Sequence, residues 1–502
     1  MTQIIDRVRC KALHGKIVSA HEAAAAIKDG MNVGTSGFTP AGYPKAVPLA
    51  LAERVRDGEN IRINLWTGAS VGAELDGALA EAGAIARRVP YQSDNILRKA
   101  INSGVVNYTD IHLSHMAQQA RHGFLGGKTD VAIVEACAIT EEGHIVPTMS
   151  LGNSPAYVRD ADIVIVEINT TQSPELEGMH DIYLVDDPPY RQPIPIIRAG
   201  DRIGVPYIPA GPDKITYIVP CDIPDRVRPL VPINDDARAM ARFVTEFFQA
   251  EVKAGRLPAE LLPLQSGVGS VANAVLAGLI DSPFENLECF TEVIQDGMFD
   301  LVSAGKLAFA SGTSITLSEE RLKRFWANMQ DYRHKLLLRP QEISNHPEVV
   351  RRLGVIAMNT AIEVDIFGHV NSTHIMGSRM MNGIGGSGDY ARNGHYTIFF
   401  TNSIAKEGAI SSIVPMCSHI DHTEHDAHVI ISERGIADLR GLSPRERARK
   451  IISIAHPDYQ PMLLEYLERA EKETRQAHTP HILKEALSWH LRFLETGTMK
   501  KQ

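Results

Sequence analysis

The sequence predicts an α/β protein built from two similar halves, each an open sheet with helices. Apolar segments typical of strands alternate with segments typical of helices along most of the chain. Two segments, 138–153 and 361–378, share one order of features: an apolar strand, an acidic residue, Gly-His, a β-branched residue, then Ser or Thr and Met. The proline-rich stretch 220–235 lies between them and is typical of a linker. We therefore expect two domains, residues 1–225 and 226–502.

In the first half, strands and helices follow one another closely. The helix predicted over 20–30 (AHEAAAAIKDG) ends at a glycine, a common helix stop. Another helix, 45–55, follows the loop GTSGFTPAGYP, and a third follows the glycine-rich turn that begins at 67–72. Predicted strands are 31–34, 61–67, 130–136 and 161–168. Because open α/β sheets bind ligands at the carboxyl ends of their strands, we expect 67–72 to lie near a ligand.

The second half begins with a helix over 236–255. LLPLQSGVG (261–269) precedes a clear apolar helix over 270–280. ENLECFTEVIQDGMFD (285–300) predicts a strand that closes on an Asp-Gly turn. Further along, Pro347 opens a helix, and 396–400 is a strand.

Composition excludes several classes of protein. The formal net charge is −9 and no run is rich in Lys or Arg, so nucleic acid is not an expected partner. The first residues lack the apolar core of a signal peptide, and no apolar run is long enough for a membrane span. The five cysteines are odd in number and widely spaced, which favours a reducing compartment. We expect a cytoplasmic protein.

The densest glycine cluster is MNGIGGSGDYARN (381–393). Its residues 383–388 spell GxGxxG, the motif of dinucleotide-binding loops, which requires a strand before it and a helix after it. Because 389–395 is short and broken by a glycine, we expect no helix there. A second near-match, 267–272, precedes a helix, but Pro263 weakens its strand. A nicotinamide-dependent oxidoreductase is therefore one alternative, and glycines that serve only turns are another.

The run HIDHTEHDAH (419–428) carries the side chains of a metal site. The HExxH pattern is absent, and the alternation resembles the rim of a strand that begins near 427. We expect solvated or hydrogen-bonded histidines and no metal.

Glu292 is conspicuous because 289–294 is otherwise apolar apart from one threonine. A carboxylate that is partly desolvated at the end of a strand is poorly hydrated and therefore a better nucleophile. Alternatively, Glu292 lies on the solvent face of a half-buried strand. The pattern alone does not separate these two interpretations.

Several long motifs, in the same order along the chain, resemble those of the acetyl-CoA hydrolase/transferase family. The members of this family are class I CoA-transferases. The motifs are GTSGFTPAGYPK (34–45), LLPLQSGVGSVANAV (261–275), TEVIQDG (291–297), QEISNHPEVVRRLG (341–354), MNGIGGSGDYARN (381–393) and ERGIADLRGLSP (433–444). The resemblance implies two similar open α/β CoA-transferase domains with the active site between them, and a homodimer. It also implies no permanently bound cofactor, with coenzyme A as a co-substrate.

The resemblance also implies roles for individual residues. Glu292 matches the family's catalytic glutamate, which attacks the acyl-CoA thioester and later carries CoA as a glutamyl thioester. Val268 and Gly386 match backbone donors to the reacting oxygens, and Asn345 matches a residue that contacts the reacting acyl group. The positions that match CoA-holding residues are Gln265, Ser266, Gly267, Val268, Gly269, Asn382, Gly386 and Lys406.

Three further positions complete what the resemblance implies. Ser70 and Arg226 match positions that receive the substrate's carboxylate, and Glu433 matches an active-site position without an assigned role. The expected reaction transfers CoA between succinyl-CoA and acetate. Transfer between propionyl-CoA and succinate, acyl-CoA hydrolysis with the same glutamate, and an inactive CoA-binding scaffold are the alternatives. The expected partners are acyl-CoA and short carboxylates.

Overall fold

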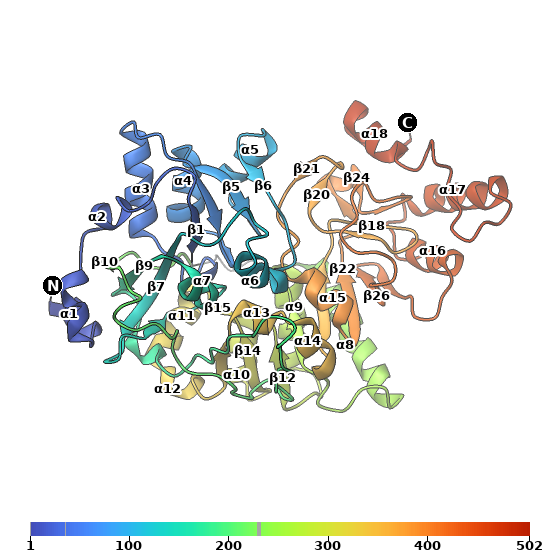
Figure 1. Ribbon diagram of the computed structural model, residues 1–502. Helices are drawn as coiled ribbons and strands as arrows, with labels where there is room; N and C mark the ends of the chain where they lie inside the picture. Colours follow the sequence, from blue (N-terminus) through green and yellow to red (C-terminus); the bar gives the residue numbers. More distant parts are fainter. Residues whose placement is uncertain (1, 36, 228–231, 502) are drawn as a thin grey trace. The chain divides into compact units, whose positions relative to one another are not determined.

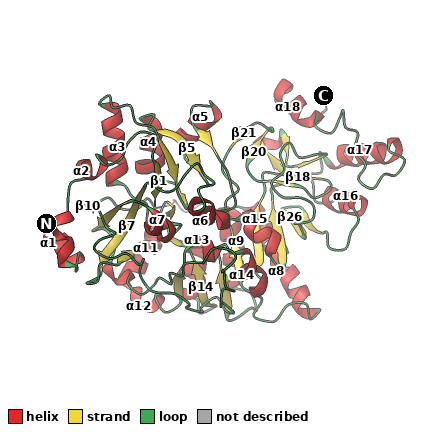
Figure 2. Ribbon diagram, in the orientation of Figure 1, coloured by secondary structure: helices red, strands yellow, loops and turns green. Residues whose placement is uncertain are grey.

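The computed structural model describes residues 2–35, 37–227 and 232–501, and it divides into two compact units (Figure 1). Unit 1 comprises Met1–Leu230, Glu288–Val302 and Ala308–Leu353, and unit 2 comprises Val231–Leu287, Ser303–Leu307 and Gly354–Gln502. Both contain parallel strands and helices, as Figure 2 shows, so the predicted α/β class with two open sheets is confirmed. The expected division into 1–225 and 226–502 stays a prediction, and positions 228–231 of the expected linker lie outside the described residues.

Unit 1 is built on a parallel sheet with the strand order β10-β9-β7-β1-β3-β5-β6. Its strands are β1 (Asn32–Thr35), β3 (Ile63–Trp66), β5 (Ile85–Val89), β6 (Asn107–Tyr108), β7 (Val131–Ile139), β9 (Ile163–Asn169) and β10 (Tyr217–Cys221). A short strand, β8 (Ile145–Pro147), pairs antiparallel with β7. The four strands predicted in this half are all present, because their apolar side chains are buried in the sheet.

Helices complete the core of unit 1. α2 (Ala20–Ala24), α3 (Ala46–Arg56) and α4 (Ala78–Glu81) contribute buried aliphatic residues to one core with the strands, and Figure 1 shows these helices together along the sheet. α6 (Leu113–Arg121) and α7 (Ser154–Asp160) pack together, and α7 also contacts β1 and β7. α2 is shorter than the predicted helix over 20–30, because the chain turns after Ala24.

The segments that join unit 1 from the second half of the chain carry Glu292. β13 (Val293–Gln295) pairs in parallel with β15 (Ser314–Thr316), and β14 (Leu307–Gly312) with β16 (Leu336–Leu338). The Asp-Gly turn predicted at 296–297 is wrong, because these residues begin α10 (Asp296–Ser303). The Asp296 carboxylate accepts a hydrogen bond from the backbone N–H of Ser318, and an acidic side chain is favourable in the first turn of a helix.

Unit 2 contains its own parallel strands, β11 (Leu264–Ser266), β17 (Ile356–Thr360), β22 (Tyr396–Phe400) and β26 (Val429–Ser432), with β27 (Gly435–Asp438) antiparallel at the edge. Its long helices α8 (Asp235–Lys253) and α9 (Ser270–Ile280) pack against each other. The helices α16 (Pro444–Ile452), α17 (Gln460–Glu473) and α18 (Ser488–Thr496) finish the chain. The predictions of α9 and β22 are confirmed with the same bounds.

The expectation of no helix over 389–395 is wrong, because the glycine-rich motif 381–393 ends in a helix, α15 (Ser387–Asn393). Its apolar residues Tyr390 and Ala391 are buried, and α15 packs on β17 and β22, so tertiary packing outweighs the local glycine density. The strand before the motif, β21 (Arg379–Met380), belongs to an antiparallel hairpin with β20 (His374–Ile375), unlike the parallel strand of a dinucleotide-binding fold. In contrast, the 267–272 near-match does follow a parallel strand, β11, despite Pro263.

Among the described residues, no helix has both the length and the apolar character needed to cross a membrane. All five cysteines are described, and each is buried and free of a disulfide.

Candidate active site

The carboxylate of Glu292 lies beside the side-chain amide of Asn345 in unit 1. Nδ2 of Asn345 donates a hydrogen bond to Oε1 of Glu292 over 2.9 Å. Glu292 is half-buried between β12 (Leu287–Phe290) and β13, whereas Asn345 is fully buried. Glu292 and Asn345 are 53 positions apart in the sequence and meet in the fold. The hydrogen bond orients the carboxylate, and the Glu292 side chain stays partly exposed. This arrangement suits the nucleophile that the sequence analysis proposed.

Asn345 is fixed at the end of a short helix, α13 (Gln341–Ser344). The hydroxyl of Ser344 donates to Oδ1 of Asn345 over 3.0 Å, and Ser344 is itself fully buried. Because Oδ1 accepts from a hydroxyl, the other amide atom, Nδ2, is directed to the carboxylate. Gln341 anchors the helix by donating from its side chain to the carbonyl of Leu113 over 2.8 Å. Ser344 was not among the predicted site residues, although it lies in the motif QEISNHPEVVRRLG (341–354).

The backbone of Glu292 is held as firmly as its side chain. Its carbonyl oxygen accepts hydrogen bonds from the backbone N–H groups of Thr313 and Ser314 at 2.8 and 3.1 Å. A Cβ on Gly312 would lie 3.0 Å from the same oxygen, so this position requires a glycine or a small shift. The backbone at Glu292 is therefore fixed to the segment 312–314 of unit 1.

The histidine that follows Asn345 is neutral at physiological pH. Burial of the His346 side chain, with Arg191 and Arg352 nearby, lowers its pKa to about 4. The donor to the Glu292 carboxylate, the side-chain amide of Asn345, is likewise neutral.

Arg226, predicted to receive a substrate carboxylate, is paired with an acidic residue. Its Nε and Nη2 donate to Oε1 of Glu74 at 3.1 and 2.9 Å, and the hydroxyl of Tyr43 donates to Oε2 of Glu74. The Arg226 side chain is 60% exposed, so it remains accessible to an anion. Ser70 lies in β4 (Ala69–Ser70), which pairs with β2 (Phe38–Thr39). Nothing in the sequence signalled Glu74, because its partners lie 31 and 152 residues away.

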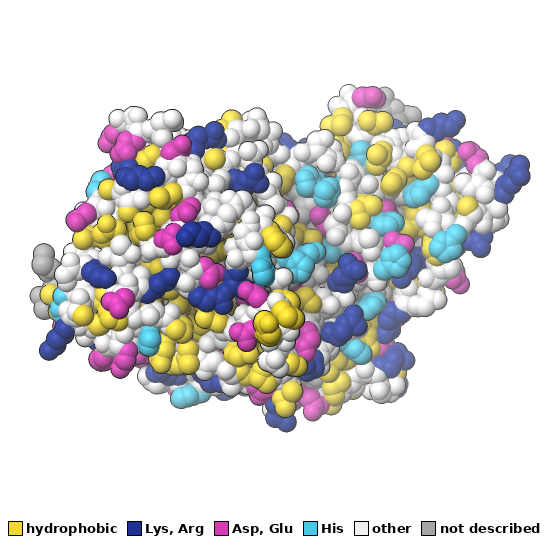
Figure 3. All heavy atoms as spheres, viewed as in Figure 1, with side chains coloured by type: hydrophobic (Ala, Val, Ile, Leu, Met, Phe, Trp, Pro, Cys, Tyr) yellow, Lys and Arg dark blue, Asp and Glu magenta, His cyan; other side chains and the backbone are white. Residues whose placement is uncertain are grey.

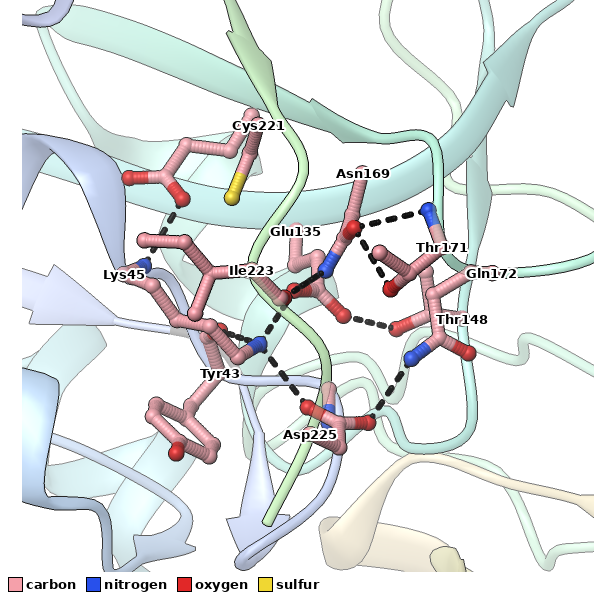
Figure 4. A network of polar contacts seen from close by, with 12 residues as sticks. Tyr43, Lys45, Glu135, Thr148, Asn169, Thr171, Gln172, Cys221, Ile223 and Asp225 are labelled. Carbon is pink, nitrogen blue, oxygen red and sulfur yellow. Dashed lines mark hydrogen bonds and ion pairs between the residues drawn. The ribbon is translucent and has the colours of Figure 1, made fainter. Parts of the chain in front are cut away.

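A buried charge network fixes the residue before Arg226 (Figure 4). Nζ of Lys45 lies 2.5 Å from the carboxylate of Glu135 and 2.8 Å from that of Asp225, and Lys45 is fully buried. Asp225 also accepts hydrogen bonds from the backbone N–H of Gly42 and from Nε2 of Gln172, both at 3.0 Å. Burial raises the pKa of Glu135 although Lys45 opposes the shift. The motif GTSGFTPAGYPK therefore anchors Asp225, and through it the backbone of Arg226.

A pocket in unit 1 opens beside Arg226. Polar groups from Gln172, Asp225 and Arg226 lie on its wall together with apolar side chains. The remaining lining residues are Pro40, Ala41, Met149, Thr171, Pro224, Val227, Ile315, Thr316, Leu317, Leu322 and Trp326. A partly exposed cation in the lining of a largely apolar pocket suits a small carboxylate.

In unit 2 the predicted CoA residues 265–269 form the loop between β11 and α9. The side chain of Gln265 is fully buried and pairs with Asn359 through two 3.1 Å amide hydrogen bonds, so it fixes the strand ends. Gly269 has φ +123°, a conformation that favours glycine, and it immediately precedes the first residue of α9. Val268 is 40% exposed at this helix N-terminus, where backbone N–H groups attract negative charge.

The second predicted loop of unit 2 is held by the histidine-rich run. Oδ2 of Asp421 accepts from the backbone N–H of Ser372 over 2.6 Å, and the Ser372 carbonyl accepts from Nδ2 of Asn382 over 3.1 Å. Nε2 of His422 lies 3.1 Å from the hydroxyl of Ser387, the first residue of α15. Gly386 caps that helix with φ −87°. The run thus contributes hydrogen bonds that shape the glycine-rich loop.

Lys406 and Glu433 also lie in unit 2. Lys406 is exposed on the turn between β23 (Ile404–Ala405) and β24 (Ile410–Ser411), with Nζ 4.9 Å from the ring centre of Phe493. The carboxylate of Glu433 accepts from the backbone N–H of Ser403 over 2.8 Å and from its hydroxyl. Glu433 therefore holds the start of the segment that carries Lys406. Within the described residues, no group of three or more His, Cys, Asp or Glu is arranged to hold a metal ion.

Sequence comparisons identify the family. Residues 1–220 match the acetyl-CoA hydrolase/transferase N-terminal domain, and residues 322–467 match its C-terminal domain. The chain belongs to the acetyl-CoA hydrolase/transferase family. Within this family it is 55% identical to succinyl-CoA:acetate CoA-transferase of Clostridium kluyveri, over 98% of this chain and 92% of that protein. It is 46% identical to acetyl-CoA hydrolase of Saccharomyces cerevisiae, over 99% and 97% of the two chains.

Solved structures agree on the fold. RipA from Yersinia pestis matches with a TM-score of 0.71 at 21% identity, over 93% of this chain and 99% of that one. A 4-hydroxybutyrate CoA-transferase from Porphyromonas gingivalis matches with a TM-score of 0.62 at 20% identity, over 91% and 98%. The glycine motifs that suggested a nicotinamide enzyme thus belong to a CoA-transferase and hydrolase family. The resemblance noted in the sequence is confirmed.

Proposed function

We propose that this protein transfers CoA from succinyl-CoA to acetate, giving acetyl-CoA and succinate. The observation that carries the proposal is the half-buried Glu292 carboxylate, held by the Asn345 amide at 2.9 Å. A relative 55% identical over 98% of the chain is named for this reaction, which supports the choice of substrates.

In the first half of the reaction, an oxygen of Glu292 attacks the thioester carbonyl of succinyl-CoA. The C–S bond breaks, CoA leaves as a thiolate, and a succinyl-glutamyl anhydride forms. The thiolate then attacks the glutamyl carbonyl of the anhydride. Succinate departs as a carboxylate, and Glu292 carries CoA as a thioester, so the energy of the thioester bond stays on the enzyme.

In the second half, acetate reverses these steps. Its carboxylate attacks the glutamyl thioester, CoA leaves again as a thiolate, and an acetyl-glutamyl anhydride forms. The thiolate attacks the acetyl carbonyl, which releases acetyl-CoA and regenerates the Glu292 carboxylate. No proton is consumed overall, and this fits a site in which the neighbouring donor is an amide and His346 is neutral.

Each of these steps passes through a tetrahedral oxyanion, which preorganised donors stabilise. We assign that role to the Nδ2–H of Asn345 and to the backbone N–H groups of Val268 and Gly386. The support for Asn345 is its hydrogen bond to Glu292, and the support for the other two is the motif resemblance. Glycine at 386 lets a backbone amide approach a ligand closely, because no side chain intervenes.

Binding of CoA as a co-substrate is assigned to unit 2. The loop 265–269 supplies a helix N-terminus for phosphate groups, Asn382 lies in the glycine-rich loop, and Lys406 adds an exposed cation. Arg226 and Ser70 are assigned to the incoming carboxylate, and the exposed guanidinium of Arg226 supports this role. A cytoplasmic homodimer of two domains per chain, 1–225 and 226–502, completes the proposal.

Hydrolysis is the second candidate, because relatives 46% identical are named acetyl-CoA hydrolases. In a hydrolase, water in place of acetate attacks the glutamyl thioester. We therefore incubate the enzyme with succinyl-CoA and follow its loss with and without acetate. The proposal predicts that loss beyond one succinyl-CoA per active site requires acetate, and that an equal amount of acetyl-CoA then forms. A comparable rate without an acceptor contradicts it, and faster turnover with propionyl-CoA and succinate would reassign the substrates.

A further inference from the structure

The residue that pairs with Arg226, Glu74, has no part in the proposed reaction. Both nitrogens on one edge of the guanidinium, Nε and Nη2, donate to Oε1 of Glu74 at 3.1 and 2.9 Å. A guanidinium has a second edge, formed by Nη1 and Nη2, which this pair does not use. Because 60% of the Arg226 side chain is exposed, a carboxylate can approach that second edge.

Glu74 is held by a second contact as well. It lies in a π-helical turn, Ala73–Gly77, a rare geometry that often occurs at functional sites. The hydroxyl of Tyr43 donates to Oε2 of Glu74 over 2.7 Å. The buried Tyr43 ring packs directly on Gly72, where a Cβ would lie 2.2 Å from a ring carbon, and Nζ of Lys45 lies 4.3 Å from the ring centre (Figure 4). Both carboxylate oxygens of Glu74 are therefore engaged, and its side chain is only 14% exposed.

The charge of Glu74 changes what Arg226 attracts. A lone guanidinium attracts a dianion about twice as strongly as a monoanion, because Coulomb energy is proportional to the charge of the ligand. A carboxylate beside it repels the two ligands in the same proportion. The pair consequently offers hydrogen-bond donors with little net charge. Over unit 1, on the left of Figure 3, basic and acidic side chains are interspersed, so on that face no broad field of one sign overrides a local balance.

This balance matters because the proposed reaction releases succinate, a dianion, and then admits acetate, a monoanion, to the same form of the enzyme. With an unpaired Arg226, succinate would bind more tightly than acetate and slow the second half of the reaction. We propose that Glu74 is a specificity-determining residue: its charge offsets that of Arg226, so that monocarboxylates compete with dicarboxylates for the guanidinium. This inference rests on the proposed function, in which Arg226 receives the incoming carboxylate.

Binding of carboxylates to the full-length protein is the direct test, because it needs no turnover. Dissociation constants for succinate and butyrate are measured by saturation-transfer NMR, since both have four carbons and they differ by one negative charge. Glu74→Gln keeps an oxygen for Arg226 and a polar partner for the Tyr43 hydroxyl, but removes the charge. We expect it to tighten butyrate about threefold and succinate about tenfold, because the electrostatic energy scales with ligand charge.

Two variants and a salt series control for other effects. Glu74→Asp keeps the charge, so the ratio of the succinate and butyrate constants should stay at its natural value. Glu59→Gln changes a similar pair of unit 1, in which Nε and Nη2 of Arg54 donate to the Glu59 carboxylate at 2.8 and 2.6 Å, and should alter neither constant. Raising the ionic strength from about 20 to about 500 mM should remove most of the Glu74→Gln effect, because salt screens exposed charges. A purely structural effect of the substitution would not depend on salt.

Turnover gives a second measurement. In the proposed reaction succinate competes with acetate for the enzyme form in which Glu292 carries CoA. Glu74→Gln should therefore lower the inhibition constant of succinate about tenfold and KM for acetate about threefold. Both effects should vanish in an Arg226→Gln background, because Glu74 acts through Arg226.

The outcomes separate this inference from the proposed function. If Arg226→Gln weakens both carboxylates but Glu74→Gln tightens neither, or tightens both equally, the role of Glu74 is overturned and Arg226 keeps its assignment. Weaker binding of both carboxylates to Glu74→Gln would also overturn it, because Glu74 would then only orient Arg226. If Arg226→Gln changes neither constant, the assignment of Arg226 and this inference both fail. The expected binding constants without any CoA transfer would support the inference and overturn the proposed reaction alone.

Discussion

The side-chain amide of Asn345 donates to Oε1 of Glu292 over 2.9 Å, and the hydroxyl of Ser344 donates to Oδ1 of the same amide over 3.0 Å. The three groups form a short chain of hydrogen bonds: the Ser344 hydroxyl orients the Asn345 amide, and the amide orients the Glu292 carboxylate. In this chain the amide of Asn345 fixes the position of Oε1 of the carboxylate. The following predictions test this arrangement and its surroundings.

Replacing Asn345 by Ala should lower kcat by about 100- to 1000-fold, because one donor to the developing oxyanion is lost. KM for acyl-CoA should change little, since the amide acts on the reacting carboxyl group and the CoA positions lie elsewhere in the sequence. Steady-state kinetics measure both constants. Asn328→Ala, at an exposed position of unit 1, is the control and should have no effect. A raised KM with an unchanged kcat would assign Asn345 to binding.

Ser344→Ala should lower kcat about tenfold, because the Asn345 amide then loses the partner that orients it. Ser344 acts through Asn345, so the two effects should not add. In a double-mutant cycle, Ser344→Ala should cost little further activity once Asn345 is already Ala. Additive losses would show that Ser344 supports the site independently, through the fold.

Gly386→Ala should reduce kcat more than it weakens CoA binding, because the oxyanion develops only in the transition state. Gly386 has φ −87°, which alanine adopts readily, so the substitution adds bulk without backbone strain. The neighbouring Gly385 has φ +61°, and Gly385→Ala should instead lower the melting temperature. Calorimetric CoA binding and kcat are compared for both variants. Equal losses of binding and turnover in Gly386→Ala would make Gly386 an ordinary turn residue.

Glu251 in unit 2 should make stability fall in acid. Hydrogen bonds from Arg256, Arg440 and the Tyr396 hydroxyl hold its pKa far below the usual 4.5. The unfolded chain therefore takes up a proton near pH 4.5 that the folded protein still excludes. The stabilisation is complete above that pH and declines below it, by up to about 1.4 kcal/mol per pH unit.

Glu251→Gln should accordingly lower the melting temperature at pH 7 by several degrees. Between pH 6 and 3.5 its free energy of unfolding should fall less than that of the natural protein. Glu246→Gln on the same helix is the control, because Glu246 is 61% exposed and its ion pair with Arg242 is a long one of 3.8 Å. Parallel declines of the natural protein and Glu251→Gln would contradict the assignment.

Local sequence patterns predicted the elements whose signals are local. The apolar helix α9 and the strand β22 were predicted with their observed bounds, because both are continuous apolar segments with a glycine shortly before them, Gly269 and Gly394. The same reasoning missed α15, where packing of Tyr390 against the sheet outweighs the glycines before it. Local reasoning also predicted a turn at Asp296. In the structure Asp296 begins α10 and accepts a hydrogen bond from the backbone N–H of Ser318, 22 residues away.

For the candidate site, too, only local signals could be predicted. Glu292 could be singled out because its sequence neighbours are apolar, and the motif resemblance supplied Asn345. Their contact, the orienting hydroxyl of Ser344 and the pairing of Arg226 with Glu74 join residues that pattern alone cannot connect. The histidine-rich run carries the residue types of a metal site. In the structure Asp421 accepts from Ser372, whose carbonyl accepts from Asn382 of the glycine-rich loop, and His422 lies beside the hydroxyl of Ser387.

The central claim is that Glu292 carries CoA during turnover. The enzyme is incubated with succinyl-CoA in the absence of acetate, digested, and analysed by mass spectrometry, with Glu292→Ala treated identically. The account predicts CoA attached through a thioester to the peptide that contains Glu292, its removal on addition of acetate, and no adduct in the variant. CoA attached at another residue, or normal turnover without any adduct at Glu292, would contradict it.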